Sequence, residues 1–272
     1  MDVKVDLKNR VAVITGGAGI LCSSMSRALA EQGAKVAILD LREEDAQKLA
    51  QEINLSGGTA LGLAVDVLDK SSLETAKDVI LKEFGTVDIL INGAGGNSPQ
   101  ATTGPEKSFF DLTTEGIQKV FNLNFLGTVL TTQVFGKIMA EKKKGVIINI
   151  SSMSAFTPLT RTIAYSAAKA AISNFTQWMA VHFNQEYSTE IRVNAIAPGF
   201  LLTDQNRYLL TDEKTGDPTE RGRNILQATP MGKYGVAEDL LGTVLFLCSD
   251  AASFINGAII PIDGAFAAYS GV

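Results

Sequence analysis

Tyr165 and Lys169 could move a proton together, because they stand four residues apart in an Ala-rich run without Gly or Pro until Pro198. Such a run predicts a helix, and residues four apart lie on the same face of a helix. A phenol has a free pKa of about 10, and a nearby ammonium group lowers that pKa, which makes the phenol a usable general acid or base. Many ordinary helix faces carry such a pair, so a structural role stays open.

A serine at the end of a strand could supply a hydrogen bond beside this pair. Ser152 follows an apolar run at 146–150, which predicts a buried strand. Ligands of open α/β sheets bind beyond the carboxyl ends of the strands. The hydroxyl group of Ser152 is therefore expected to contact a ligand, with Ser151 and Ser154 as alternatives.

The composition limits the classes to which the chain can belong. Its 272 residues, 46% hydrophobic and 19% charged, predict a soluble globular protein with a sizeable core. A net charge of -5, with no basic cluster beyond residues 142–144, argues against a nucleic-acid partner or an anionic membrane. No apolar run is long enough to span a membrane, and residues 1–7 lack the apolar core of a signal peptide.

The two cysteines and the single histidine do not indicate a metal site. Cys22 and Cys248 lie far apart and have no metal-ligand spacing, so we expect no metal and a reducing, cytoplasmic location. His182 stands in an apolar helical context and is expected to be a packed side chain rather than a catalyst.

The start of the chain predicts the opening unit of a dinucleotide-binding fold: a strand at 11–14, a glycine-rich turn, a helix ending at Gly33 and a strand at 36–39. Glycines let the backbone approach a pyrophosphate, and the helix N-terminus supplies N–H groups. Asp40 can bind the adenosine ribose and repel a 2′-phosphate, which favours NAD over NADP. Arg42 weakens this preference without reversing it. A turn that serves geometry alone is the alternative.

The rest of the chain alternates predicted strands and helices, with strands at 60–65, 87–91, 146–150, 191–196 and 258–262. This pattern predicts one α/β domain over residues 1–272, a doubly wound, Rossmann-like parallel sheet with helices on both faces. The segment from about 200 to 229 is polar and irregular in composition, and we expect it to form a lid over a site.

The helix expected after residue 113 contains two asparagines. Thr114 is its predicted N-cap, with Glu115 in the first turn. Asn122 and Asn124 lie among apolar residues, where an amide without a hydrogen bond is costly. One of the two is therefore expected to have a structural or catalytic partner.

Over essentially its whole length, the chain resembles the short-chain dehydrogenase/reductase family. The motifs that carry the resemblance are Thr15-Gly16, Asp66-Val67, Asn92-Gly93-Ala94-Gly95, Asn124, Ser152, Tyr165-x-x-x-Lys169 and Pro198-Gly199, in the family's order and spacing. The resemblance implies a cofactor site, which we expect to comprise Gly16, Gly19, Ile20, Leu21, Asp40, Asp66, Val67, Asn92, Ala94, Gly95, Tyr165, Lys169, Pro198, Gly199 and Thr203.

The resemblance also implies roles for four catalytic residues. Tyr165 would donate or accept the proton, and Ser152 would hydrogen-bond the substrate oxygen. Lys169 would bind the nicotinamide ribose and lower the pKa of Tyr165, and Asn124 would hold a water that links Lys169 to solvent. Hydride transfer to a carbonyl carbon leaves charge on its oxygen, which needs such donors. A protein that binds NAD without chemistry is the competing hypothesis, which a broken Tyr/Lys pair would favour.

Two features depart from the family's pattern. Ile20 and Cys22 stand where the usual turn has glycines, and their side chains are expected to narrow the space beside the pyrophosphate. Gly93 replaces a common asparagine. Cys22 could be a reactive thiol at a helix N-terminus, although a small packing residue is the preferred interpretation.

A narrower resemblance is to the D-mannonate oxidoreductases (fructuronate reductases) of this family, through segments 16–23, 92–103 and 268–272. It implies the reduction of D-fructuronate with NADH, or a related reaction on gluconate, another polyol or a 3-oxoacyl group, in a homotetramer. The substrate carboxylate would need a local cation. The candidate substrate-binding residues are Asn97, Ser154, Arg161 and Arg207.

Overall fold

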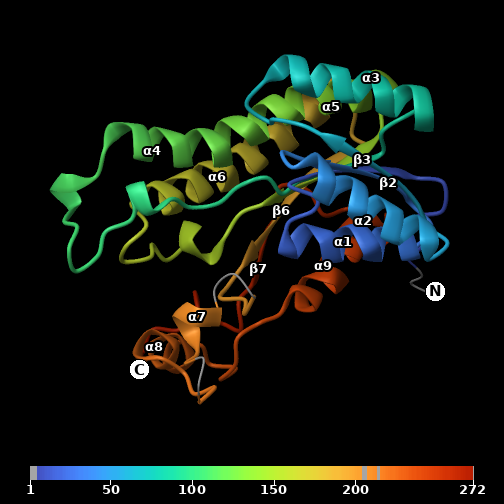
Figure 1. The fold of residues 1–272 in the computed structure, drawn as a ribbon. Helices are drawn as coiled ribbons and strands as arrows, with labels where there is room; N and C mark the ends of the chain where they lie inside the picture. The colour runs from blue at the N-terminus through green and yellow to red at the C-terminus, as the bar shows by residue number, and fades with distance from the viewer. Residues whose placement is uncertain (1–4, 204–206, 213–214, 272) are drawn as a thin grey trace.

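Seven strands form one parallel sheet in the computed structural model, which describes residues 5–203, 207–212 and 215–271 (Figure 1). The order across the sheet is β3-β2-β1-β4-β5-β6-β7, and every neighbouring pair is parallel. The strands are β1 (Val11–Thr15), β2 (Lys35–Asp40), β3 (Thr59–Ala64), β4 (Ile89–Asn92), β5 (Gly145–Ile150), β6 (Ile191–Pro198) and β7 (Ile259–Ile262). The predicted doubly wound, Rossmann-like sheet is confirmed.

Helices cover both faces of the sheet (Figure 1). One face packs against α1 (Ile20–Glu31), α2 (Glu43–Leu55) and α9 (Leu241–Cys248). The other face packs against α3 (Lys70–Phe84), α5 (Gly127–Lys142) and α6 (Ile163–Glu186). The remaining helices are α4 (Thr114–Phe121), α7 (Arg207–Leu210) and α8 (Glu220–Ala228).

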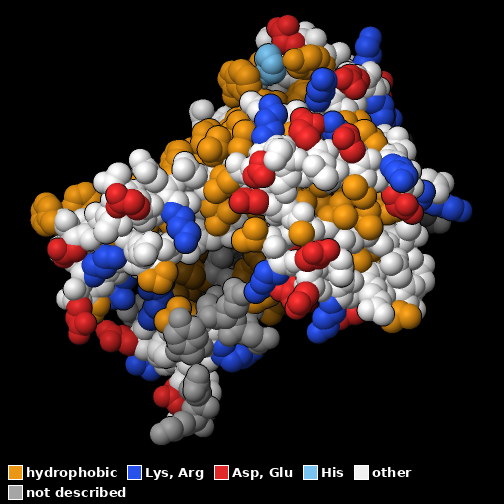
Figure 2. Space-filling model, turned by 45° about the horizontal axis from the view of Figure 1, so that its top comes forward, with side chains coloured by type: hydrophobic (Ala, Val, Ile, Leu, Met, Phe, Trp, Pro, Cys, Tyr) orange, Lys and Arg blue, Asp and Glu red, His pale blue; other side chains and the backbone are white. Residues whose placement is uncertain are grey.

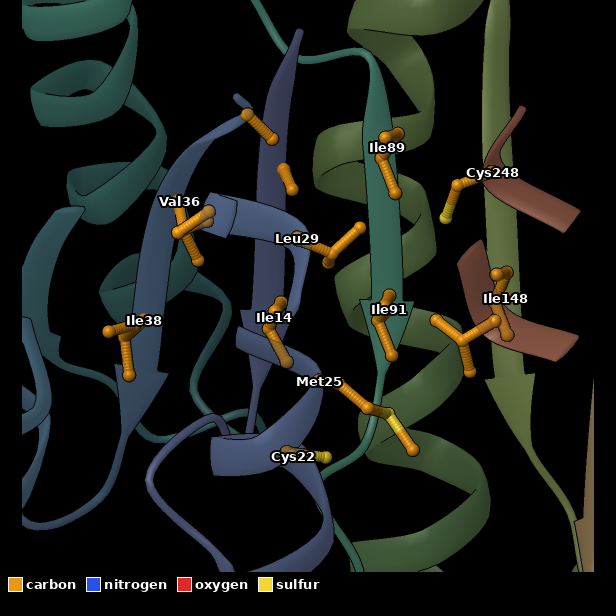
Figure 3. Close-up of a cluster of buried hydrophobic side chains, with 14 of the residues drawn as sticks. Ile14, Cys22, Met25, Leu29, Val36, Ile38, Ile89, Ile91, Ile148 and Cys248 are labelled. Carbon is orange, nitrogen blue, oxygen red and sulfur yellow. The ribbon is translucent and has the colours of Figure 1, made fainter. Parts of the chain in front are cut away.

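The alternation of side chains along each strand divides the core into two layers. In β1, Ala12 and Ile14 belong to the layer under α1, whereas Val11 and Val13 belong to the layer under α3 and α5. Figure 3 shows the first layer, where side chains of β1, β2, β4 and β5 meet those of α1. Because both faces are buried, the strands are almost continuously apolar.

The strand order reverses between β1 and β4, since β1 continues to β2 on one side and pairs with β4 on the other. Ligands of open parallel sheets bind at such a reversal, outside the carboxyl ends of the strands. The ends of β1 and β4 are therefore where a site is expected.

The predicted long helix through the two asparagines is confirmed, because the backbone stays helical from α4 through a π-helical turn (Asn122–Leu126) into α5. Two local predictions need correction. The N-cap of α4 is Thr113 and not Thr114, because the hydroxyl group of Thr113 accepts the N–H of Gly116 (3.1 Å). The segment 200–229 is not irregular throughout, because its described part contains α7 and α8. No helix in the described ranges is long and apolar enough to cross a membrane.

Candidate active site

A cavity of about 610 Å³ opens at the carboxyl ends of β1, β4, β5 and β6. This volume is typical of a small-molecule or cofactor site. The cavity is lined by nearly all the residues predicted to bind a cofactor: Gly16, Gly19, Ile20, Leu21, Asp40, Asp66, Val67, Ala94, Gly95, Tyr165, Pro198, Gly199 and Thr203. Ser152 lines it as well, whereas Asn92 and Lys169 do not.

The glycine-rich turn brings the backbone close to the loop after β4. Gly16 has a left-handed φ of +59°, and a Cβ atom there would lie 2.9 Å from the Cα atom of Ala94. Gly19 is the N-cap of α1, and as a glycine it makes no side-chain hydrogen bond to the N–H groups of the first turn. These N–H groups, at residues that line the cavity, suit the pyrophosphate of a dinucleotide.

Asp40 is fixed at the end of β2 by two backbone groups. Its carboxylate accepts the N–H of Ala18 and the N–H of Arg42, both at 3.2 Å. The guanidinium group of Arg42 is paired with Asp45 on α2 (2.6 Å). Asp40 therefore lines the cavity as an acid, while the nearest candidate for binding a 2′-phosphate is engaged in an exposed ion pair.

Tyr165, Lys169 and Ser152 come together as their spacing predicts. The hydroxyl group of Ser152 lies beside the phenol of Tyr165 and acts to lower its pKa. Lys169 is buried, with its Nζ atom 5.4 Å from the centre of the Tyr165 ring. The ammonium group donates to the carbonyl oxygen of Ile150 at the end of β5 (2.7 Å). The strand end and the first turns of α6 thus hold all three groups beside the cavity.

The predicted effect of Lys169 on Tyr165 is not what this structure shows. Burial raises the pKa of Tyr165 above its ordinary value, and the hydroxyl group of Ser152 only partly opposes this rise. Burial also lowers the pKa of Lys169 to about 8. Desolvation by burial is the largest cause of both shifts, while the ammonium group of Lys169 lies over the ring and donates to the carbonyl oxygen of Ile150.

The two alternative serines are engaged or hidden. The hydroxyl group of Ser151 bonds that of Ser173 (2.8 Å) and donates to the carbonyl oxygen of Lys169 (3.1 Å). Ser154 is buried outside the cavity lining, and its hydroxyl oxygen has no partner in the described part of the chain. Ser152 is therefore the serine whose hydroxyl group meets Tyr165.

Asn124 binds the backbone of the loop after β4. Its amide accepts the N–H of Gly96 (3.2 Å) and donates to the carbonyl oxygens of Gly96 (2.7 Å) and Val120 (2.8 Å). The expectation that one of the two asparagines has a partner is confirmed for Asn124, whereas Asn122 is exposed. Asn124 lies within the π-helix, a feature frequent at functional sites.

Asn92 has a structural position rather than one at the cavity. Its side chain donates to Thr132 on α5 (3.0 Å) and to Asn149 on β5 (2.8 Å). The amide is buried in the sheet and ties β4 to its neighbours. The side chain of Asn92 therefore binds within the sheet and does not line the cavity, and the expected contact of this residue with the cofactor stays a prediction.

A family model described as short chain dehydrogenase matches residues 10–214, three quarters of the chain and all of its motifs up to Thr203. The chain belongs to this family. It is an oxidoreductase that acts on alcohol or ketone groups, and the short-chain dehydrogenases use nicotinamide cofactors.

Relatives support the same assignment over the whole length. The chain is 52% identical to an uncharacterized oxidoreductase, UxuB, of Bacillus subtilis, over 98% of both proteins. It is 32% identical to the D-threitol dehydrogenase of Mycolicibacterium smegmatis, over 98% of this chain and 96% of the relative. A crystal structure from Haemophilus influenza, of a protein provisionally named a D-mannonate oxidoreductase with bound NAD, matches with a TM-score of 0.93 at 52% identity, over 98% of both chains.

The two departures of this short-chain dehydrogenase from the family pattern occupy the same space. Cys22 is buried in the core under α1, near Met25 (Figure 3), and burial raises the pKa of its thiol to about 12. It is a packing residue and not a reactive thiol. A Cβ atom at Gly93 would lie 2.2 Å from the sulfur of Cys22, so the sulfur fills the room that a side chain at position 93 would need.

Gly93→Ala is expected to lower the free energy of unfolding by about 1–3 kcal/mol, the usual cost of overpacking. In a Cys22→Gly background the cost should be smaller, because only the contact with the backbone oxygen of Thr15 (2.8 Å) remains. Urea unfolding of the four proteins of this double-mutant cycle measures the coupling. Gly104→Ala, with no atom within 4 Å of the new Cβ, is the control. An equal cost in both backgrounds would contradict the shared-space interpretation.

The predicted substrate residues do not form one cluster. Asn97 is exposed and its amide donates to Thr102 (2.8 Å). Arg207 begins α7 and is exposed, and the described lining of this cavity and of the one beside it does not include it. Arg161 lines a second cavity beside the first.

Sequence reasoning missed the apolar part of the cavity wall. These residues carry no motif, because many apolar side chains would serve the same purpose: Leu41, Val65, Leu123, Met153, Leu159, Phe200 and Leu201. The signal at Leu41 comes from the structure and not from the sequence: this apolar side chain after β2 is 73% exposed, which suggests a ligand surface.

Proposed function

We propose that this enzyme interconverts a sugar-acid ketone and the matching alcohol, most specifically D-fructuronate plus NADH and D-mannonate plus NAD. The observation that carries the proposal is that Ser152 and Tyr165 line one cavity, which suits a dinucleotide, and that the hydroxyl group of Ser152 acts on the phenol. The 52% identity to the Haemophilus protein named for D-mannonate supports the choice of substrate.

Different side chains of the chain have different roles at the substrate oxygen. A bound nicotinamide supplies the hydride, so the chain must supply the proton. Burial keeps Tyr165 protonated at neutral pH, ready to give its proton to the ketone oxygen, while Ser152 donates a hydrogen bond to that oxygen. Lys169 provides positive charge behind the phenol and a donor for the nicotinamide ribose. The water that Asn124 is expected to hold beside Lys169 stays a prediction.

We also infer a preference for NADH over NADPH. Asp40 lines the cavity with a fixed carboxylate, and Arg42 is paired with Asp45. A 2′-phosphate beside this carboxylate would meet a like charge, and the guanidinium group of Arg42 is already paired with Asp45.

Asp40→Ala is expected to raise kcat/KM with NADPH by about 10- to 100-fold, because it removes a like-charge contact. Initial rates with NADH and NADPH measure the change. Glu43→Ala removes an exposed acid at the start of α2 and is the matched control. It should leave the ratio of kcat/KM with NADPH to kcat/KM with NADH unchanged. Equal efficiency of the wild type with both cofactors would contradict the inferred preference.

The substrate is tested with a panel of uronates, aldonates and polyols, followed by nicotinamide absorbance. Activity on D-fructuronate or D-mannonate well above that on the polyols is expected. A polyol is the second candidate, favoured by the identity of 32% to D-threitol dehydrogenase. Robust activity on a polyol and none on either sugar acid would replace the first candidate by the second.

We propose that the segment 200–229 covers the substrate. Phe200, Leu201 and Thr203 at its start line the first cavity, and α8 lines the second. The segment therefore borders both the cofactor and the space beyond it.

We propose further that the enzyme is a homotetramer. An apolar groove of about 640 Å³ runs between α5 and α6, and Trp178 in its lining is 56% exposed. His182 stacks on Trp178 at 4.6 Å, and hydrophobic side chains gather beside this histidine on the surface (Figure 2). Such a face on two long helices suits a second copy of the chain. The mass by light scattering tests this, and a monomer would contradict it.

A further inference from the structure

A second cavity of about 470 Å³ lies beside the catalytic one. The two share Leu159 and Phe200 as lining residues, so the second begins where the first ends. One wall is the loop 157–162 before α6, which leads to Tyr165, and another is α8. A substrate whose reacting carbon lies at Tyr165 could therefore extend its far end into this cavity.

Two guanidinium groups line the second cavity. Arg161 comes from the loop before α6 and Arg221 from the first turn of α8. Neither is in a salt bridge or side-chain hydrogen bond with any residue that the structure describes. By contrast, Arg223, two residues further along α8, donates to the carbonyl oxygen of Pro218 (2.7 Å) and lies outside the lining.

The rest of the lining suits an anion with hydroxyl groups. Asn224 supplies an amide, and threonine hydroxyls come from positions 157, 160 and 162. Among the described lining residues, the one carboxylate is Glu220. Glu220 stands at the N-terminus of α8, where the helix dipole stabilises an acid without a cationic partner. Two guanidinium groups against one carboxylate leave the cavity positively charged, although the whole chain has a net charge of -5.

We propose that Arg221, together with Arg161, binds the carboxylate of the substrate. This rests on the proposed function, because it assumes a sugar acid whose ketone lies at Tyr165 and Ser152. In D-fructuronate the ketone and the carboxylate lie at opposite ends of the carbon chain. The ketone could therefore lie in the first cavity while the carboxylate lies in the second. Guanidinium groups bind carboxylates through paired, charge-assisted hydrogen bonds. Of the two arginines considered from the sequence, Arg161 lines this cavity and Arg207 does not.

The test compares D-mannonate with D-mannitol, which has the same carbon skeleton without the carboxylate. Arg221→Gln is expected to raise the KM for D-mannonate by about 10- to 100-fold, the loss of one charged hydrogen-bond pair. The rate of Arg221→Gln with D-mannitol should stay within about twofold of the wild-type rate, because this polyol makes no charged contact with the arginine. Arg221→Lys should recover part of the loss, Arg161→Gln should act in the same direction, and Arg223→Gln should change neither substrate.

An unchanged KM for D-mannonate in Arg221→Gln overturns the proposal, and so does an equal loss with both substrates. If the wild type oxidises no sugar acid, the proposed function fails, and calorimetric binding of D-mannonate to the enzyme with NADH then decides the subsite. Binding that Arg221→Gln weakens and Arg223→Gln preserves supports the carboxylate site. No binding to the wild type, or equal binding by both variants, overturns it.

Discussion

Tyr165→Phe is expected to lower kcat for ketone reduction by at least about 10³-fold, while NADH still binds. The variant keeps the ring that lines the cavity and removes only the hydroxyl group beside Ser152. General acid catalysis by a positioned side chain contributes about 10² to 10⁴ in rate. Nicotinamide absorbance measures turnover, and the fluorescence of bound NADH measures affinity.

The matched control for this variant is Tyr187→Phe. Tyr187 ends α6, the helix that carries Tyr165, and packs against Phe183 far along the helix from the cavity. This control should keep the wild-type kcat. Unchanged turnover in Tyr165→Phe would refute the role of Tyr165, and loss of NADH binding would show that the phenol acts in binding rather than proton transfer.

Lys169→Met is expected to abolish turnover and yet stabilise the fold at pH 7. Burial lowers the pKa of Lys169 from 10.5 to about 8, so the folded state holds its charge at a cost of about 3 kcal/mol. The hydrogen bond to Ile150 returns about 1 kcal/mol, which leaves a net gain of about 2 kcal/mol for the variant. Urea unfolding at pH 7 measures this difference.

The contribution of Lys169 to the free energy of unfolding depends on pH. Between about pH 8 and 10.5, the unfolded chain holds a proton that folded Lys169 has lost, so its contribution to stability rises with pH. Below about pH 8 both states are protonated and the full penalty is present. The advantage of Lys169→Met should therefore be largest near neutral pH and shrink towards pH 10. An advantage that is constant over this range would contradict the assigned cost.

The fold was predictable because local patterns specify it. The apolar strands that end in small or acidic residues, such as Asp40, require a parallel sheet with a crevice at its carboxyl edge. The spacing of Tyr165 and Lys169 was sufficient to place both on one face of a helix. These features depend on neighbours within a few residues along the chain.

The remaining features depend on contacts that spacing does not reveal. The pKa of Tyr165 is raised because of burial, which the pattern of one helix cannot measure. Asn92 follows a strand in the way a ligand-binding residue would, yet its amide partners lie 40 and 57 residues away. Arg221 belongs to no motif, and only the packing of α8 beside the loop before α6 places it near the site.

The contact between Cys22 and Gly93 has a consequence for protein engineering. A consensus library built from the family would introduce a glycine at position 22 and an asparagine at position 93 as independent choices. A side chain at position 93 would overlap the sulfur of Cys22, and Cys22→Gly alone leaves a gap in the core. The two exchanges are therefore expected to be epistatic, because the loss of Cys22 lowers the cost of a side chain at position 93.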